Sequence, residues 1–152
     1  MNLSYSVLPL IVTGKQVCYT NSMKDLKKVL DILSLTDNLN NIRLKAIYNL
    51  VLPPLELGQY IIYEDKEVPL CWASWALLSD KTSKLYAARK YNLKPEDWNS
   101  GNNLWLVNII CPYGGGDIAL KRLDKLRKEK NLPRVVNFRR LGSGRTSHVQ
   151  RI

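Results

Sequence analysis

The sequence predicts an α+β fold, in which helices flank a central and largely antiparallel sheet. Two continuous apolar runs, Pro69–Leu77 and Leu104–Ile110, are typical of buried strands that lie next to each other. Apolar residues recur at helical spacing at 23–33 and at 118–126, with charged residues between them. The length of 152 residues fits one domain, 1–152, and 45% hydrophobic with 24% charged residues is a globular composition.

The part of the chain before residue 58 predicts two helices. Ser22 and Asp25 have the spacing of a capping box, so we expect the first helix to begin at Ser22 and to reach Leu33. Polar residues at 34–41 predict a loop, and a second helix follows over Ile42–Leu50. We expect this helix to stop at Val51-Leu52-Pro53-Pro54, because proline interrupts helical hydrogen bonding.

Beyond residue 58 the pattern changes to strands, with two helices among them. Ser79 and Asp117 each precede a helical pattern and are the expected N-caps of helices that reach Arg89 and Leu126. The remaining strands are expected at Gln59–Tyr63, Arg134–Leu141 and Arg145–Ile152, with turns at 64–67 and 142–144.

The net charge of +10 is concentrated at one end of the chain. Residues 121–152 carry eleven Lys or Arg and two acidic residues, which leaves only +1 for residues 1–120. A basic third of this kind indicates an acidic partner, whether nucleic acid, an anionic membrane or an acidic protein, although a solvated basic helix face is an equal alternative. The partner-binding candidates in this third are Lys121, Arg122, Lys125, Arg139 and Arg140.

The three cysteines, Cys18, Cys71 and Cys111, form no C-x-x-C pair. An odd number at wide spacing is a poor disulfide framework and a poor zinc site, so we expect reduced cysteines and no metal site. The apolar stretch Leu3–Val12 is shorter than the roughly 20 residues of a membrane span and lacks the basic start of a signal peptide. We therefore expect an intracellular protein.

Two features point to a ligand pocket, and each has a plainer explanation. Glycines at 114–116 join a predicted strand to a predicted helix, where free N–H groups attract a phosphate, but Asp117 would repel one and such turns are common connectors. All four tryptophans lie within 34 residues, at 72–105, where they line either an acyl or nucleobase pocket or the core. His148 is the one histidine, which excludes a relay of several histidines.

Several short motifs occur in a fixed order between residues 51 and 114. They are Val51-Leu52-Pro53, Gln59-Tyr60, the run Pro69–Ser79, Glu96-Asp97-Trp98-Asn99-Ser100-Gly101, Trp105-Leu106-Val107-Asn108-Ile109-Ile110 and Pro112-Tyr113-Gly114. In this order and spacing they resemble the RTX toxin-activating lysine acyltransferases, the activators of hemolysin-type protoxins. The resemblance covers about 22–131, is weak at Ser147-His148-Val149, and leaves 1–21 as an N-terminal extension.

The resemblance implies a fold similar to the GNAT acetyltransferases, a dimer, and a cytoplasmic enzyme that moves a fatty acyl group from acyl carrier protein to a lysine of a partner protein. The acyl-phosphopantetheine of the carrier is then the donor, and the protein itself holds no cofactor. Because acyl carrier protein is acidic, it suits the basic third of the chain. The substrate-binding candidates are Trp75, Trp105, Pro112, Tyr113, Gly114 and Gly115.

Two positions depart from the family pattern. The family's catalytic His lies in the loop before Val51, but residues 36–40 contain none, and the family's essential Asp is replaced by Asn108. A neutral amide orients groups by hydrogen bonding but cannot accept a proton as a general base. Asn108 is thus the catalytic candidate by position, with Asp37 or Asp97 as a substitute polar partner.

Two other functions therefore stay open beside the transferase. One is a catalytically silent relative that binds a partner or serves a structural role, for example in a phage, which would associate it with the virion. The other is an accessory protein that binds nucleic acid through the basic third.

Overall fold

The computed structural model describes residues 19–37, 39, 41–139 and 149–151. Five strands form one sheet in the order β1-β2-β3-β4-β5, with bounds β1 Tyr60–Asp65, β2 Val68–Leu78, β3 Asn103–Ile110, β4 Val135–Phe138 and β5 Val149–Arg151. The helices are α1 Tyr19–Ser34, α2 Leu44–Leu50, α3 Leu52–Leu57, α4 Asp80–Ala87 and α5 Gly116–Glu129, with a 3₁₀ turn η1 at Pro95–Asp97.

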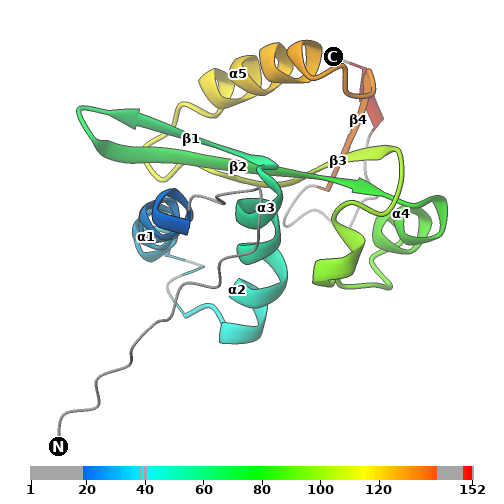
Figure 1. Ribbon diagram of the computed structural model, residues 1–152, viewed down its shortest axis with the longest axis horizontal. Coiled ribbons are helices and arrows are strands. Elements are labelled where there is room, and N and C mark those ends of the chain that lie inside the picture. Colours follow the sequence, from blue (N-terminus) through cyan, green and yellow to red (C-terminus); the bar gives the residue numbers. More distant parts are fainter. Residues whose placement is uncertain (1–18, 38, 40, 140–148, 152) are drawn as a thin grey trace, which may run out of the picture.

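Helices cover both faces of the sheet. Figure 1 shows α5 on one side and α1, α2 and α3 on the other, with α4 near one end of the strands. Three of the four strand pairs are antiparallel, and only β3 and β4 run parallel. This arrangement is the expected α+β class and is consistent with a GNAT-like fold.

The two apolar runs are adjacent central strands, which confirms the prediction. β2 pairs with β3 from Trp72 opposite Ile110 to Leu78 opposite Asn103. The register shifts between Ser74 and Trp75, so that Val107 of β3 is an extra residue between two pairs. We call residues 75–78 with 103–106 the closed half of this strand pair, and residues 72–74 with 107–110 the open half.

The third central strand supports only the closed half. β4 pairs with β3 at two positions, Trp105 opposite Asn137 and Leu106 opposite Phe138. The connection from β3 to the parallel β4 runs through α5, as a crossover requires. The edge of β3 beyond Leu106 therefore has no paired neighbour among the described strands.

All four tryptophans are buried in the core, at most 2% exposed. Trp98 and Trp105 pack with Leu78 and Tyr86 beside the closed half, Trp75 packs with Leu106 and Leu123 under α5, and Trp72 packs against α1 and α3. Gly101 lies so close to the end of β2 that an added Cβ would be 2.6 Å from the Leu78 oxygen. This contact explains the glycine without any special backbone angle.

Two predicted boundaries were wrong, and a third is confirmed. α1 begins at Tyr19, so Ser22 lies inside the helix. α2 ends at Leu50, as expected, and Pro53 and Pro54 lie in the first turn of the next helix, α3, where the missing N–H groups are not needed. The N-cap of α5 is Gly115 with φ 86°, and Asp117 lies in the first turn. The predicted turn 142–144 and most of the extension lie outside the described residues.

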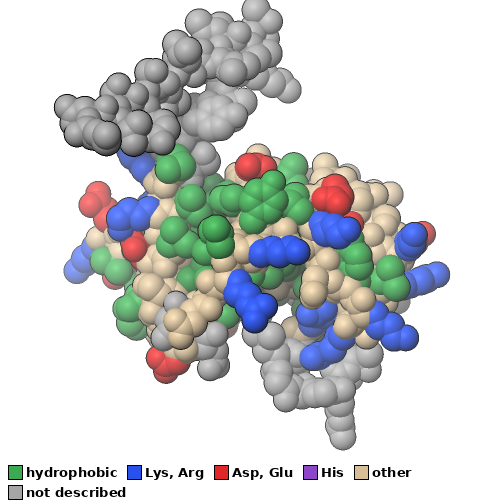
Figure 2. Space-filling view, turned by 90° about the horizontal axis from the view of Figure 1, so that it is seen from below, with side chains coloured by type: hydrophobic (Ala, Val, Ile, Leu, Met, Phe, Trp, Pro, Cys, Tyr) green, Lys and Arg blue, Asp and Glu red, His purple; other side chains and the backbone are tan. Residues whose placement is uncertain are grey.

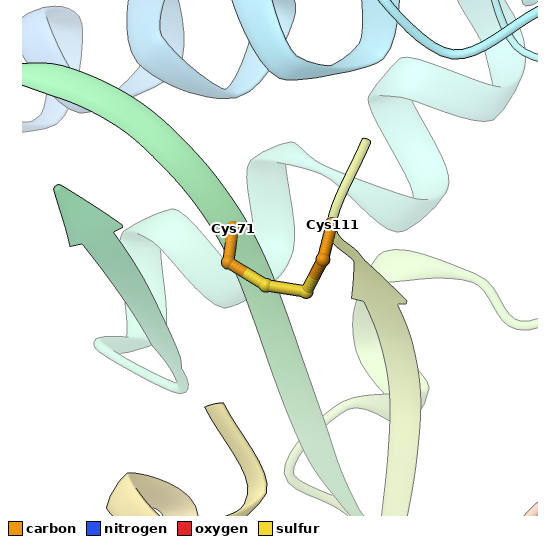
Figure 3. Close-up of a disulfide and its surroundings, with 2 residues drawn as sticks. All are labelled: Cys71 and Cys111. Atoms are coloured by element: carbon orange, nitrogen blue, oxygen red, sulfur yellow. A yellow bond between two sulfur atoms is a disulfide. The ribbon is translucent and has the colours of Figure 1, made fainter. Parts of the chain in front are cut away.

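The expectation of reduced cysteines was also wrong for one pair. Cys71 on β2 and Cys111, directly after β3, form a disulfide with a Cα–Cα distance of 4.2 Å (Figure 3). Their neighbours Trp72 and Ile110 are paired across the two strands, which places the two cysteines opposite each other. Spacing along the chain could not reveal this contact, because 40 residues separate them.

Candidate functional site

A cavity of about 530 Å³ lies along the open half, where β4 no longer pairs with β3. The cavity is lined by side chains from α1 and the loop after it, from β2 and β3, and from the end of β4 and the residue that follows it. Fifteen described residues line the cavity, and all but Tyr86, Asn108 and Arg139 are apolar. The apolar ones are Leu33, Leu39, Ile42, Leu50, Val51, Trp72, Leu106, Val107, Ile109, Ile110, Leu120 and Phe138. The lining suits an apolar ligand.

Asn108, the catalytic candidate, lies in this wall. Its Nδ2 donates to Ser74 Oγ at 2.8 Å and to the Leu50 carbonyl at 3.2 Å, which fixes the orientation of the amide. No described residue donates a hydrogen bond to its Oδ1, so this oxygen can accept one from an incoming amine. It cannot take a proton from that amine near neutral pH.

Leu39 lines the same cavity as Asn108. The loop before Val51, where the resemblance places a catalytic His, and the position where it places an Asp therefore meet at one site. No carboxylate or imidazole is present among the described residues of the lining. The two substitute partners lie elsewhere: Asp37 is exposed, and the Asp97 carboxylate accepts from Tyr91 at 2.9 Å and from the Lys94 N–H at 2.8 Å, where it holds η1.

Tyr86 and Arg139 supply the two other polar groups of the lining. The guanidinium carbon of Arg139 lies 4.1 Å from the centre of the Tyr86 ring, and its Nη1 donates to the Tyr86 carbonyl at 3.2 Å. Burial raises the pKa of the Tyr86 phenol, and the nearby Arg139 cation opposes that rise. The phenol therefore stays protonated at neutral pH.

The substrate-binding candidates do not line the cavity. Trp75 and Trp105 are packed in the core, and the indole N–H of Trp105 donates to Ser83 Oγ at 2.9 Å. The turn between β3 and α5 contains the other four candidates, Pro112, Tyr113, Gly114 and Gly115. In this turn the Gly114 N–H donates to the Cys111 carbonyl at 3.0 Å. Both glycines have positive φ, 84° and 86°, which explains their identity by backbone shape.

The basic candidates separate into two places. Lys121, Arg122 and Lys125 are exposed on α5, and the Arg122 guanidinium lies 4.5 Å from the centre of the Tyr63 ring. Arg139 lies in the cavity, and Arg140 is outside the described residues, as is His148.

Part of the positive charge of α5 is neutralised within the helix. Asp124 pairs with Lys128 at 2.6 Å and with Arg127 at 2.7 Å, and both hydrogen bonds lower the pKa of this carboxyl. Lys121, Arg122 and Lys125 stay exposed on this helix, and Lys125 lies 3.9 Å from Glu129.

Within 19–139, apart from residues 38 and 40, and at 149–151, no three His, Cys, Asp or Glu side chains gather into a metal-binding group. No helix of the same described residues combines the length and apolarity that a bilayer crossing needs.

Sequence reasoning missed Tyr86 as a polar group of the cavity, and it assigned Arg139 to partner binding rather than to this lining. Trp72 was one of the four tryptophans for which pocket and core were both left open. No local pattern marks Tyr86, because it reaches the cavity from α4.

The site can be compared with known proteins. The model of the HlyC, or RTX toxin acyltransferase, family matches residues 19–152. The leukotoxin-activating lysine-acyltransferase LktC of a Pasteurella haemolytica-like species is 33% identical over 76 residues, which cover 50% of this chain and 46% of the relative. The protein-lysine palmitoyltransferase CyaC of Bordetella bronchiseptica is 35% identical over 92 residues, covering 60% and 50%. The protein-lysine myristoyltransferase RtxC of Kingella kingae is 34% identical over 76 residues, covering 50% and 46%.

The relatives share one class of activity: by name, they are acyltransferases that act on lysine. The chain belongs to the RTX toxin acyltransferase family. It spans about half the length of the curated relatives that it matches.

Proposed function

We propose that this protein is a protein-lysine fatty acyltransferase, which takes the acyl group from acyl carrier protein and transfers it to a lysine of a partner protein. The observation that carries the proposal is the apolar cavity beside Asn108, at the place where the family resemblance puts the chemistry. An extended acyl chain would lie against the apolar wall of the open half. The thioester carbon would then face Asn108.

The partners follow from charge. The acyl-phosphopantetheine arm of an acidic carrier protein would bring the donor, and the exposed Lys121, Arg122 and Lys125 on α5 offer a complementary surface for the carrier. The acceptor lysine must be neutral to attack the thioester. Asn108 Oδ1 would accept a hydrogen bond from its N–H group, but no carboxylate or imidazole in the described lining removes its proton.

This gap in the chemistry favours a second candidate, a catalytically silent relative that keeps the cavity for binding. Positioned acid–base groups typically accelerate a reaction by roughly 10²–10⁴-fold. A protein without them transfers acyl groups slowly, by proximity alone.

The two candidates are separated by intact-mass spectrometry after incubation with acylated carrier protein and a lysine-bearing acceptor. The wild type is compared with the double variant Leu39→His with Asn108→Asp, which restores both family groups at the one cavity. Fast transfer by the wild type supports the transferase. Transfer only by the double variant, faster by about 10²–10⁴-fold, shows a scaffold that kept its cavity and lost its base.

The matched control is Leu35→His with Asn137→Asp, which makes the same residue changes at an exposed loop position and on β4. Neither of these two residues lines the cavity. An equal gain in the control would contradict a role for the site beside Asn108.

A further inference from the structure

The cavity contains one charged side chain. Among its fifteen described lining residues, Arg139 is the only Lys, Arg, Asp or Glu. The acyl chain of a thioester carries no charge, and its carbonyl oxygen becomes negative only in the tetrahedral intermediate. A permanent cation in this wall can therefore also bind a ligand that is already an anion.

Arg139 is held in place and is not neutralised by a described acid. Its contacts are the ring and the carbonyl oxygen of Tyr86, and none of the ion pairs between described residues includes it. One of its five N–H groups is used by that carbonyl, which leaves others to donate. A half-buried guanidinium in apolar surroundings is stabilised most by an anion with two oxygens.

The rest of the cavity defines what that anion is attached to. The neighbouring wall consists of aliphatic and aromatic side chains, including Phe138 directly before Arg139, and the volume of about 530 Å³ lies within the range of small-molecule sites. An elongated apolar chain with one terminal carboxylate fits both the apolar wall and the Arg139 guanidinium. Figure 2, seen from the side of α1, α2 and α3, shows hydrophobic side chains grouped on this face with Lys and Arg side chains among them.

We propose that the cavity binds free long-chain fatty acids, with the carboxylate paired to Arg139 and the hydrocarbon chain against the apolar wall. The inference concerns the same cavity as the proposed function but does not depend on acyl transfer. It gives the cavity a ligand whether or not the chemistry of the family survives.

The experiment compares palmitic acid with methyl palmitate, two ligands of equal chain length that differ in charge. Binding to the full chain is measured by displacement of a fluorescent fatty-acid probe at constant salt. We expect the wild type to bind the acid more tightly than the ester by about 10-fold or more, because a hydrogen bond to a charged group stabilises by roughly 1.5–3 kcal/mol.

Arg139→Gln should reduce the affinity for the acid by about 10–100-fold and leave the ester unchanged. The matched control is Arg134→Gln, which removes the same charge from an exposed position outside the lining and should change neither. Leu39→Trp fills the cavity from a loop and should weaken both ligands. Circular dichroism checks that each variant is folded.

Equal affinity of the wild type for acid and ester would overturn the proposal without any variant. The proposal would also be overturned if the Arg139→Gln variant bound the acid as tightly as the Arg134→Gln variant. That result is expected if the guanidinium binds a phosphate of the carrier's prosthetic group instead of a carboxylate. Acyl transfer is assayed separately: a protein that binds palmitate but transfers nothing contradicts the proposed function and leaves this inference standing.

Discussion

The closed and open halves of the β2–β3 pair are both largely apolar but differ in their surroundings. In and beside the closed half, two buried indole N–H groups have partners: Trp98 donates to the Asn49 carbonyl and Trp105 to Ser83 Oγ, both at 2.9 Å. In the open half, the buried indole nitrogen of Trp72 has no partner among the described residues, and the wall borders a cavity.

Apolarity alone does not account for the difference, because both halves are largely apolar: the closed half contains Trp and Leu, and the open half contains Trp, Val and Ile. The difference comes from the third strand. Among the described residues, β4 pairs with β3 only at Trp105 and Leu106, so the closed half has a third strand beside it and the open half does not. A ligand site is formed where strand pairing ends, and the closed half supplies the stability.

The largest effect is expected at Trp98, which packs beside the closed half. Trp98 is fully buried, and Trp98→Ala should lower the free energy of unfolding by about 3–5 kcal/mol. Ile109→Ala in the open half should cost less than about 1 kcal/mol, since Ile109 is 39% exposed. Urea denaturation measures both. Similar losses at the two positions would remove the distinction between the halves.

The disulfide should contribute next. It closes a loop with a sequence separation of 40 residues at the end of the open half, and a bond of this kind stabilises by about 2–4 kcal/mol. Unfolding in the presence and absence of a reductant should differ by this amount, and Cys111→Ser should abolish the difference. Alkylation of both Cys71 and Cys111 in denatured but unreduced protein would show that the bond does not form.

A smaller effect is expected from the same Asn-to-Asp change at two positions, one in the open half and one on β4, beside the closed half. Asn108→Asp loses the donor to the Leu50 carbonyl, and Asn137→Asp loses a similar donor to the Leu104 carbonyl at 3.0 Å. We expect a loss of about 1 kcal/mol in the open half, where the cavity lets the carboxylate be solvated, and about 2 kcal/mol on β4. The new carboxyls should have raised pKa values in the folded state, because the protonated form can donate again.

A raised carboxyl pKa means that the folded state binds more protons than the unfolded state, so both variants should lose stability as the pH rises from about 4 to 7. Denaturation at these two pH values measures the loss. Variants that are more stable at pH 7 than the wild type would contradict the donor role of the amides.

The smallest effect concerns β1, beside the open half. Burial, together with a hydrogen bond from its hydroxyl to Asp25 at 2.6 Å, raises the pKa of Tyr60 to about 12. The folded state then keeps a proton that the unfolded state releases near pH 10, so stability falls as the pH rises from about 10 to 12. Tyr60→Phe should flatten this part of the unfolding profile. An unchanged slope would exclude Tyr60 as its cause.

The sequence predicted β2 and β3 as neighbours because a strand buried on both faces is apolar without interruption. It misjudged features that depend on partners far along the chain. The stop of α2 before Pro53 and Pro54 was predicted, but the new helix α3 that contains both prolines was not. Asp117 was expected to cap α5, but the N-cap is Gly115. The pairing of Cys71 with Cys111 follows from strand register, which no spacing rule contains.

The candidate site was predicted in part. Asn108 was found through its motif and does lie at the cavity, but Arg139 was assigned to a docking surface because a charge count cannot tell which face of a strand a side chain occupies. The tryptophan cluster was open to two interpretations, and burial shows that Trp75 and Trp105 belong to the core.

The two-position contact between β3 and β4 also has a consequence for how the chain is made. The partners Trp105 and Asn137 are 32 residues apart and can meet only after α5 is in place. Contacts of such separation form slowly, because the loop must close before they are gained. During synthesis on the ribosome the edge of β3 is therefore exposed until residues 135–138 emerge. An exposed apolar edge is a site for pairing with other chains. We therefore expect the yield of folded protein to depend on how quickly residues 135–138 are synthesised.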